Sequence, residues 1–128
     1  MGALDRKVYK EIDLCLERIY PASIILAEKV VAAGLDNKSQ LRGFETLINA
    51  TTRFSEIQNY IKNQAGKENN AAAKWRLVSP MMLVQLDSLE TEAHRIAGSD
   101  PQQILDVKLR LARGWAKQVV CHFLYKRP

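Results

Sequence analysis

The sequence contains little of what marks secreted, membrane-spanning or metal-binding proteins. Of its 128 residues only two are cysteines, Cys15 and Cys121, and neither belongs to a CxxC or other metal-spaced cluster. No apolar run is long enough to cross a bilayer, and no apolar segment follows a basic start at the N-terminus. We therefore expect no membrane partner and a cytoplasmic location. Apolar neighbours favour buried thiols, although the sequence leaves a disulfide bridge between the two cysteines open.

The chain also lacks the strict polar–apolar alternation of a half-buried strand, and it has no internal repeat or low-complexity tract. Its apolar fraction of 47% and charged fraction of 26% are ordinary for a globular protein. A chain of this length is predicted to form one domain, residues 1–128. The predicted fold class is all-α, a compact bundle of about four to five helices.

The first helix is predicted from the apolar residues that recur at three- and four-residue steps after Asp5. Pro21 interrupts this pattern, so we expect the helix to break or kink there. Gly34 is expected to end it as a left-handed cap, because glycine adopts positive φ without steric cost. Residues 35–38 form a short polar turn in this interpretation.

Two further helical segments follow. One is predicted over residues 39–65, with Ser39 as its cap. After a loop, the helical pattern resumes over residues 71–98. Ser79 and Pro80 together resemble a fresh cap and first-turn proline, which predicts a break near Pro80. Both one kinked helix and a short helix followed by a longer one fit this segment.

The last helix carries the net charge of the chain. It is predicted to begin at Asp100, the N-cap, followed by Pro101. Positions 1–100 hold equal numbers of basic and acidic residues, so the net charge of +5 resides in the remainder. At about 100° per residue, one broad face of this helix is apolar. The opposite side carries a cationic stripe, which consists of Arg110, Arg113 and Lys117.

This cationic stripe has two interpretations. A phosphate backbone needs cations repeated along a line with little demand on geometry, which favours binding of RNA or DNA without base recognition. The alternative is an ordinary solvated face in which Asp106 pairs with Arg110 four residues on. The polar face of the 39–65 helix adds Arg42 and Arg53 as candidate phosphate contacts, but acidic residues are mixed with them there.

No convincing catalytic constellation is present in the sequence. His94 lies near a helix end, where a cation is favourable. His122 follows Cys121, but adjacent helical positions point about 100° apart, and no further ligand keeps regular spacing nearby. We find no GxGxxG or Walker-type phosphate loop. We therefore expect no catalytic residue, no metal site and no cofactor, with a small helical enzyme using His122 and Cys121 as a remote alternative.

Three stretches resemble one known family, the small all-helical (Csm-type) subunit of type III CRISPR effector complexes. The first is Lys38-Ser39-Gln40-Leu41-Arg42-Gly43-Phe44, which is similar to the start-of-helix pattern of that family. The second is Lys74-Trp75-Arg76-Leu77, and the third is the closing segment from Val119 to Lys126. The stretch Ser79-Pro80-Met81-Met82 departs from the family pattern.

The resemblance implies a non-catalytic, RNA-binding subunit. Copies of such a subunit stack along the filament, contact other effector-complex subunits, and line the path of crRNA paired with single-stranded target RNA. By position, Arg42 and Arg76 match basic residues of the family pattern. The competing hypothesis is a helical protein–protein interaction module whose basic C-terminal helix binds an acidic partner.

Overall fold

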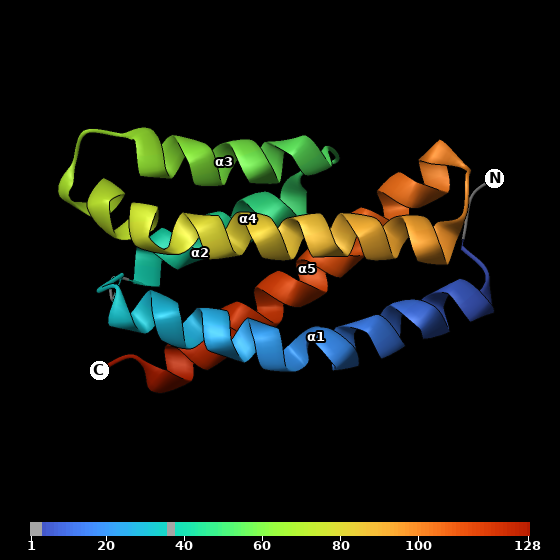
Figure 1. Ribbon diagram of the computed structural model, residues 1–128, viewed down its shortest axis with the longest axis horizontal. Helices are drawn as coiled ribbons and strands as arrows, with labels where there is room; N and C mark the ends of the chain where they lie inside the picture. Colours follow the sequence, from blue (N-terminus) through green and yellow to red (C-terminus); the bar gives the residue numbers. More distant parts are fainter. Residues whose placement is uncertain (1–3, 36–37) are drawn as a thin grey trace.

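The computed structural model describes residues 4–35 and 38–128 as an all-helical bundle, which confirms the predicted fold class (Figure 1). Within these ranges there is no β-strand. The helices are α1 (Arg6–Ala32), α2 (Lys38–Ala50), α3 (Phe54–Gly66), α4 (Asn70–Ala97) and α5 (Pro101–Lys126). Residues 36 and 37 of the predicted polar turn lie outside the described residues.

Helix α5 is the element around which the others are arranged. In Figure 1 it crosses diagonally behind α1 and α4, which run antiparallel to each other. Helix α3 lies beside α4, and α2 packs against α5. Helix α5 contacts every one of the other four helices, so it is enclosed on most of its circumference.

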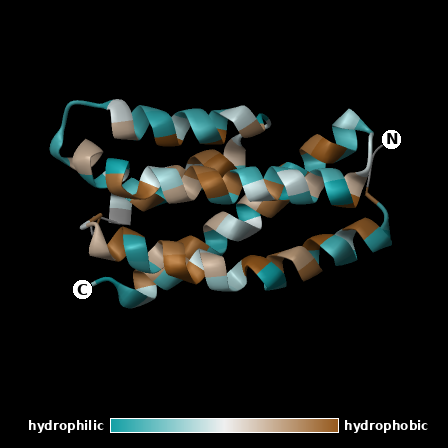
Figure 2. Cartoon of the chain, viewed as in Figure 1, coloured by the Kyte–Doolittle hydropathy of each residue, from teal (hydrophilic) through white to brown (hydrophobic). Residues whose placement is uncertain are grey.

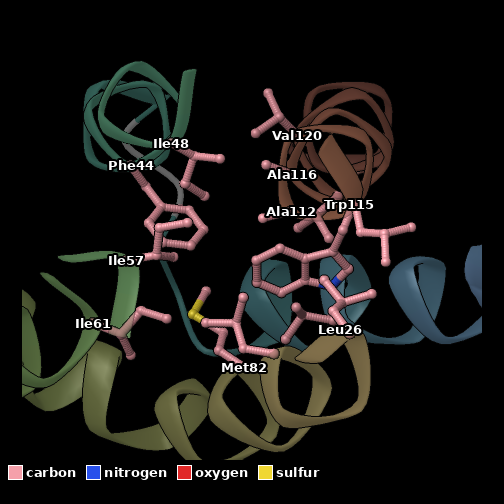
Figure 3. Packing of buried hydrophobic residues seen from close by; sticks show 14 of the residues in the cluster. Leu26, Phe44, Ile48, Ile57, Ile61, Met82, Ala112, Trp115, Ala116 and Val120 are labelled. Atoms are coloured by element: carbon pink, nitrogen blue, oxygen red, sulfur yellow. The ribbon is translucent and has the colours of Figure 1, made fainter. Parts of the chain in front are cut away.

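The hydrophobic core forms where these helices meet (Figure 3). Figure 3 shows Trp115 of α5 pointing toward Leu26 and Met82, while Phe44 and Ile57 approach from the other side. The Phe44 ring also meets the Trp115 ring edge-on, with centroids 5.9 Å apart, a favourable aromatic geometry. The buried residues of α5 are Ile104, Val107, Leu109, Leu111, Ala112, Trp115, Ala116, Val119, Val120 and Phe123.

The breaks predicted at the two internal prolines do not occur, since α1 continues through Pro21 and α4 through Pro80. Of the two alternatives for residues 71–98, the structure has the single helix. A proline inside a helix removes one backbone hydrogen bond. Packing on both sides of each proline offsets this loss. Val78 and Met82 flank Pro80 and are both fully buried, so the two halves of α4 pack into one core. Ser79 consequently lies inside α4 and caps nothing.

The single helix predicted over 39–65 is instead two helices, α2 and α3, with the chain turning at Thr51. The Thr51 hydroxyl accepts a hydrogen bond from the Arg53 amide at 3.1 Å and donates to Glu56 at 2.5 Å. Threonine competes with the helix for backbone hydrogen bonds in this way and therefore favours turns. The turn lets Phe44 and Ile57 reach the same core from two helices.

The remaining helix ends follow the capping rules. Gly34 and Gly98 both have positive φ, 86° and 81°, as expected after a helix end. Asp100 accepts a hydrogen bond from the Gln102 amide at 3.0 Å and caps α5 as predicted. Asn69 caps α4 by accepting from the Ala72 amide at 2.8 Å. Because α2 begins at Lys38, Ser39 lies inside the helix that it was predicted to cap.

Two glutamines join α1 to the other long helices on either side of Pro21. Gln85 accepts a hydrogen bond from Trp115 Nε1 at 2.8 Å and donates to the Ala22 carbonyl at 3.0 Å. Gln118 donates to the Leu16 carbonyl at 3.0 Å and accepts from the buried Ser23 hydroxyl at 2.8 Å. These bonds provide polar partners for groups that the core would otherwise desolvate.

Replacement of Gln85 by leucine should therefore lower the free energy of unfolding by about 2 kcal/mol, because the indole N–H of Trp115 would lose its acceptor inside the core. Chemical denaturation of the purified variant measures this change. Gln102→Leu, at an exposed position of α5, is the matched control and should leave stability unchanged. An equal effect of the two substitutions would show that the buried hydrogen bonds contribute nothing.

Candidate nucleic-acid interface

The structure divides the three residues of the cationic stripe among different environments. Arg110 is exposed, but its guanidinium contacts the Asp106 carboxylate at 3.2 Å. The same guanidinium lies over the Tyr9 ring, 5.0 Å from the ring centroid. Arg110 is thus held by a carboxylate of its own helix and an aromatic ring of α1, the pairing expected for the solvated-face interpretation.

Arg113 points toward the end of α2. Its Nε donates to the Ile48 carbonyl at 3.4 Å and its Nη2 to the Thr51 carbonyl at 3.2 Å. The last carbonyls of a helix have no partner within that helix. A cation near them is also favoured by the negative end of the helix dipole. Arg113 therefore caps α2, and its donors are directed into the protein.

Lys117 is exposed and lines an open groove between α1 and α5. The carboxylates of Asp13 and Glu17 line the same groove from α1. Negative charges beside a lysine oppose the approach of a phosphate. The structure therefore does not bring the stripe together as one phosphate-binding line.

The other candidate contacts lie on separate elements. Arg42 of α2 pairs with Glu45 at 3.5 Å, and Arg53 precedes α3 and lies 3.9 Å from Glu56. The turn at Thr51 separates these two arginines, so they share no helical face. Arg76 donates to the Ala65 carbonyl at 2.7 Å, near the end of α3, and is otherwise exposed.

Ion pairs concentrate where α1 begins and α4 ends. Arg95 contacts Glu92 at 2.8 Å and Glu11 at 3.6 Å, and Arg18 reaches the same Glu92 at 2.8 Å. The hydrogen bond from Arg95 lowers the pKa of Glu92, which keeps this carboxylate ionised. Burial, and secondarily the negative charge of Glu92, raises the pKa of the nearby Cys15 thiol. This cluster links α1 to α4 and neutralises Arg18 and Arg95. Arg6, Lys7 and Lys10, at the start of α1, are exposed and form no ion pair within the described residues, but they lie close in sequence to Asp5, Glu11 and Asp13.

Unpaired positive charge gathers at the opposite end of the bundle, where α1 and α5 end and α3 connects to α4 (Figure 1, left). We call this surface the basic end. Figure 2 shows the connection between α3 and α4 and the C-terminal residues there as hydrophilic, whereas the end of α1 is more apolar. In the described part of the chain, none of its six cations forms an ion pair with a carboxylate. They are Lys29, Lys67, Lys74, Arg76, Lys126 and Arg127; the described acidic residues nearby are Glu28 and Glu68.

Helix polarity explains part of this charge distribution. The C-termini of α1, α3 and α5 meet at the basic end, and each carries the negative end of a helix dipole. Lys74 lies beside Gly34 just past the end of α1, and Lys126 lies in the last turn of α5. Arg76 donates a hydrogen bond to a carbonyl in the last turn of α3. Sequence reasoning found Arg76 but missed the others, because they come from four separated segments. No pattern within one helix could have grouped them.

The residues considered for catalysis are not assembled into a site. His122 pairs with Glu28 of α1 at 3.3 Å, and His94 lies in the last turn of α4. Both cysteines are free thiols, and Cys121 is exposed, contrary to the prediction that both are buried. Residues 4–35 and 38–128 contain no group of side chains suited to hold a metal ion. No helix in these ranges is long and apolar enough to cross a membrane.

Comparison of this chain with protein-family models, with curated proteins and with solved structures finds no match. The type III CRISPR resemblance therefore stays a prediction from short motifs.

The capping role of Arg113 can be separated from a role in binding. Arg113→Lys retains the charge but loses the planar fork that reaches two carbonyls, so it should lower the free energy of unfolding by about 1 kcal/mol. Urea denaturation measures the loss. Lys117→Arg, which keeps the charge at an exposed position of α5, should not change stability. Wild-type stability of Arg113→Lys would contradict the capping role.

Proposed function

We propose that this chain is a non-catalytic RNA-binding subunit that contacts the phosphate backbone through its basic end. The observation that carries the proposal is the uneven charge along the bundle. At the end of the bundle where α1 begins, Arg18 and Arg95 are neutralised by ion pairs with Glu11 and Glu92. The other cations there, Arg6, Lys7 and Lys10, alternate in sequence with the acidic residues Asp5, Glu11 and Asp13. In the described part of the chain, the six cations of the basic end form no ion pair with a carboxylate and are accompanied by only two acidic residues. Phosphates bind where positive charge is least compensated.

The distribution of the basic end over several segments suits a flexible, single-stranded ligand. Lys67 lies between α3 and α4, Arg76 in α4, and Lys126 in α5, so cations are spread across one end of the molecule. A polyanion that binds such a surface gains affinity from each phosphate neutralised and needs no base recognition. Binding of this kind is independent of sequence and weakens with salt.

The resemblance of three short stretches to the small subunit of type III CRISPR effector complexes suggests which RNA is bound. It would be crRNA and single-stranded target RNA of such a complex. The partners would be other subunits of that complex and further copies of this chain along its filament. Arg76 supports this assignment, since it belongs both to a family-like motif and to the basic end. The two ends of the bundle also differ in charge, which suits contacts in which unlike ends of neighbouring copies meet.

Charge reversal at matched positions tests the proposal. Lys67→Glu with Lys126→Glu should weaken binding of an unstructured, labelled RNA at least about tenfold at low salt. It should also reduce the slope of log affinity against log salt by about one to two. Fluorescence anisotropy across a salt series measures both quantities.

Lys7→Glu with Lys10→Glu is the control, since it changes the net charge equally at the other end of the bundle. This pair should have a much smaller effect. The pair Arg110→Glu and Lys117→Glu tests the cationic stripe in the same way. A larger loss from either of these pairs than from the basic-end pair would contradict the proposed location.

The alternative function is a helical interaction module that binds an acidic protein surface through its basic C-terminal helix, α5. The exposed Tyr125 beside Lys126 favours it, because tyrosine and cations together are typical of protein interfaces. It predicts a stoichiometric complex that survives nuclease treatment, formed by a protein that ignores RNA even at low salt. Co-purification with and without nuclease separates the two functions.

A further inference from the structure

The groove between α1 and α5 combines an aromatic and apolar lining with carboxylates. Its volume is about 790 Å³. Leu16 packs closely on Gly114, since a Cβ atom at Gly114 would lie 2.6 Å from Leu16 Cδ1. Tyr20 of α1 and Tyr125 of α5 also line the groove, and their exposed fractions are 50% and 81%. Two rings this exposed are available to a ligand.

Asp13 and Glu17 extend along the α1 side of this groove. They are four residues apart, so they lie on the same face of the helix. Neither carboxylate has an ion pair or side-chain hydrogen bond in the described part of the chain. Like charges at this spacing destabilise a helix, and a bound cation would relieve the repulsion.

The same two helices already hold one arginine in a matching environment. The Arg110 guanidinium lies 5.0 Å from the centroid of the Tyr9 ring and 3.2 Å from the Asp106 carboxylate. The groove offers the same set of partners, a tyrosine of α1 with carboxylates beside it, but without an arginine among them. A guanidinium fits such a set because it stacks on a ring and accepts bidentate pairing at once.

We infer that the α1–α5 groove binds an arginine side chain of a basic segment of a protein partner. The guanidinium pairs with Asp13 and Glu17 and stacks on Tyr20. The aliphatic stem packs on Leu16, and Tyr125 covers the flank of the segment. This site lies between α1 and α5, and its Tyr125 is followed in sequence by Lys126 of the basic end. The inference does not depend on the RNA-binding proposal.

The charge of the groove selects against an anionic occupant. A phosphate placed there would meet two carboxylates and one lysine, Lys117, while the other basic side chain of the lining, His122, lies 3.3 Å from the Glu28 carboxylate. Lys117 also competes with the incoming arginine for the same carboxylates. Loss of this lysine should therefore strengthen the binding of an arginine peptide and weaken the binding of an anion.

The test uses a short fluorescein-labelled peptide in which arginine and leucine are separated by glycines, and a matched peptide with glutamate in place of arginine. Fluorescence anisotropy with the full chain should show saturable binding of the arginine peptide alone. Asp13→Asn with Glu17→Gln should weaken it at least about tenfold, and Lys117→Gln should strengthen it severalfold.

Glu68→Gln with Asp87→Asn is the matched control, because it removes two exposed carboxylates outside the groove and should leave affinity nearly unchanged. Chemical-shift changes at Gly114 on titration with the arginine peptide would place the peptide in the groove. The inference is overturned if the arginine peptide does not bind, if the two double variants weaken it equally, or if Lys117→Gln also weakens it.

Discussion

The burial of α5 by the other four helices is the constraint on which the rest of the structure depends. A helix usually leaves one side in water, but α5 contacts α1, α2, α3 and α4. Only a narrow strip of its surface remains for charged side chains. The cations on that strip meet residues of α1 or the end of α2 before they meet a ligand.

This constraint decides what each basic residue of α5 can do. Arg113 is turned toward the end of α2, where backbone carbonyls need donors. Arg110 is held over Tyr9, and Lys117 stands opposite two carboxylates. Among the basic residues of the last segment that the structure describes, those without such neighbours are Lys126 and Arg127, close to where α1 and α3 also end. There, three helix C-termini favour cations, and the same cations remain exposed enough to attract a polyanion.

Local signals in the sequence were sufficient for much of the fold. Asp100 with Pro101 marked the start of α5, and Gly34 marked the end of α1, because capping depends on one or two residues. The helical periodicity of apolar residues in α5 also predicted most of the residues that this helix buries. Pro21 and Pro80 misled the prediction, since tertiary packing outweighs the loss of one backbone hydrogen bond within a long helix.

The candidate site was harder to predict, because it is formed by residues that are far apart in the sequence and meet only in the folded chain. Helical periodicity correctly grouped Arg110, Arg113 and Lys117 on one side of α5, but it contains no information about what α1 and α2 place opposite them. The turn at Thr51, which separates Arg42 from Arg53, was visible only as a pair of threonines within an apolar pattern. The basic end joins residues from four segments, and only the packed bundle brings these together.

The claim that matters most is that uncompensated charge, and not the stripe on the central helix, determines where a polyanion binds. Lysine acetylation, measured by mass spectrometry with and without a saturating single-stranded RNA, tests it directly on the unmodified sequence. Lys67, Lys74 and Lys126 should become protected by RNA, while Lys117, Lys7 and Lys10 keep their reactivity. Protection of Lys117 without protection of Lys67 and Lys126 would contradict the claim, as would no protection at any lysine.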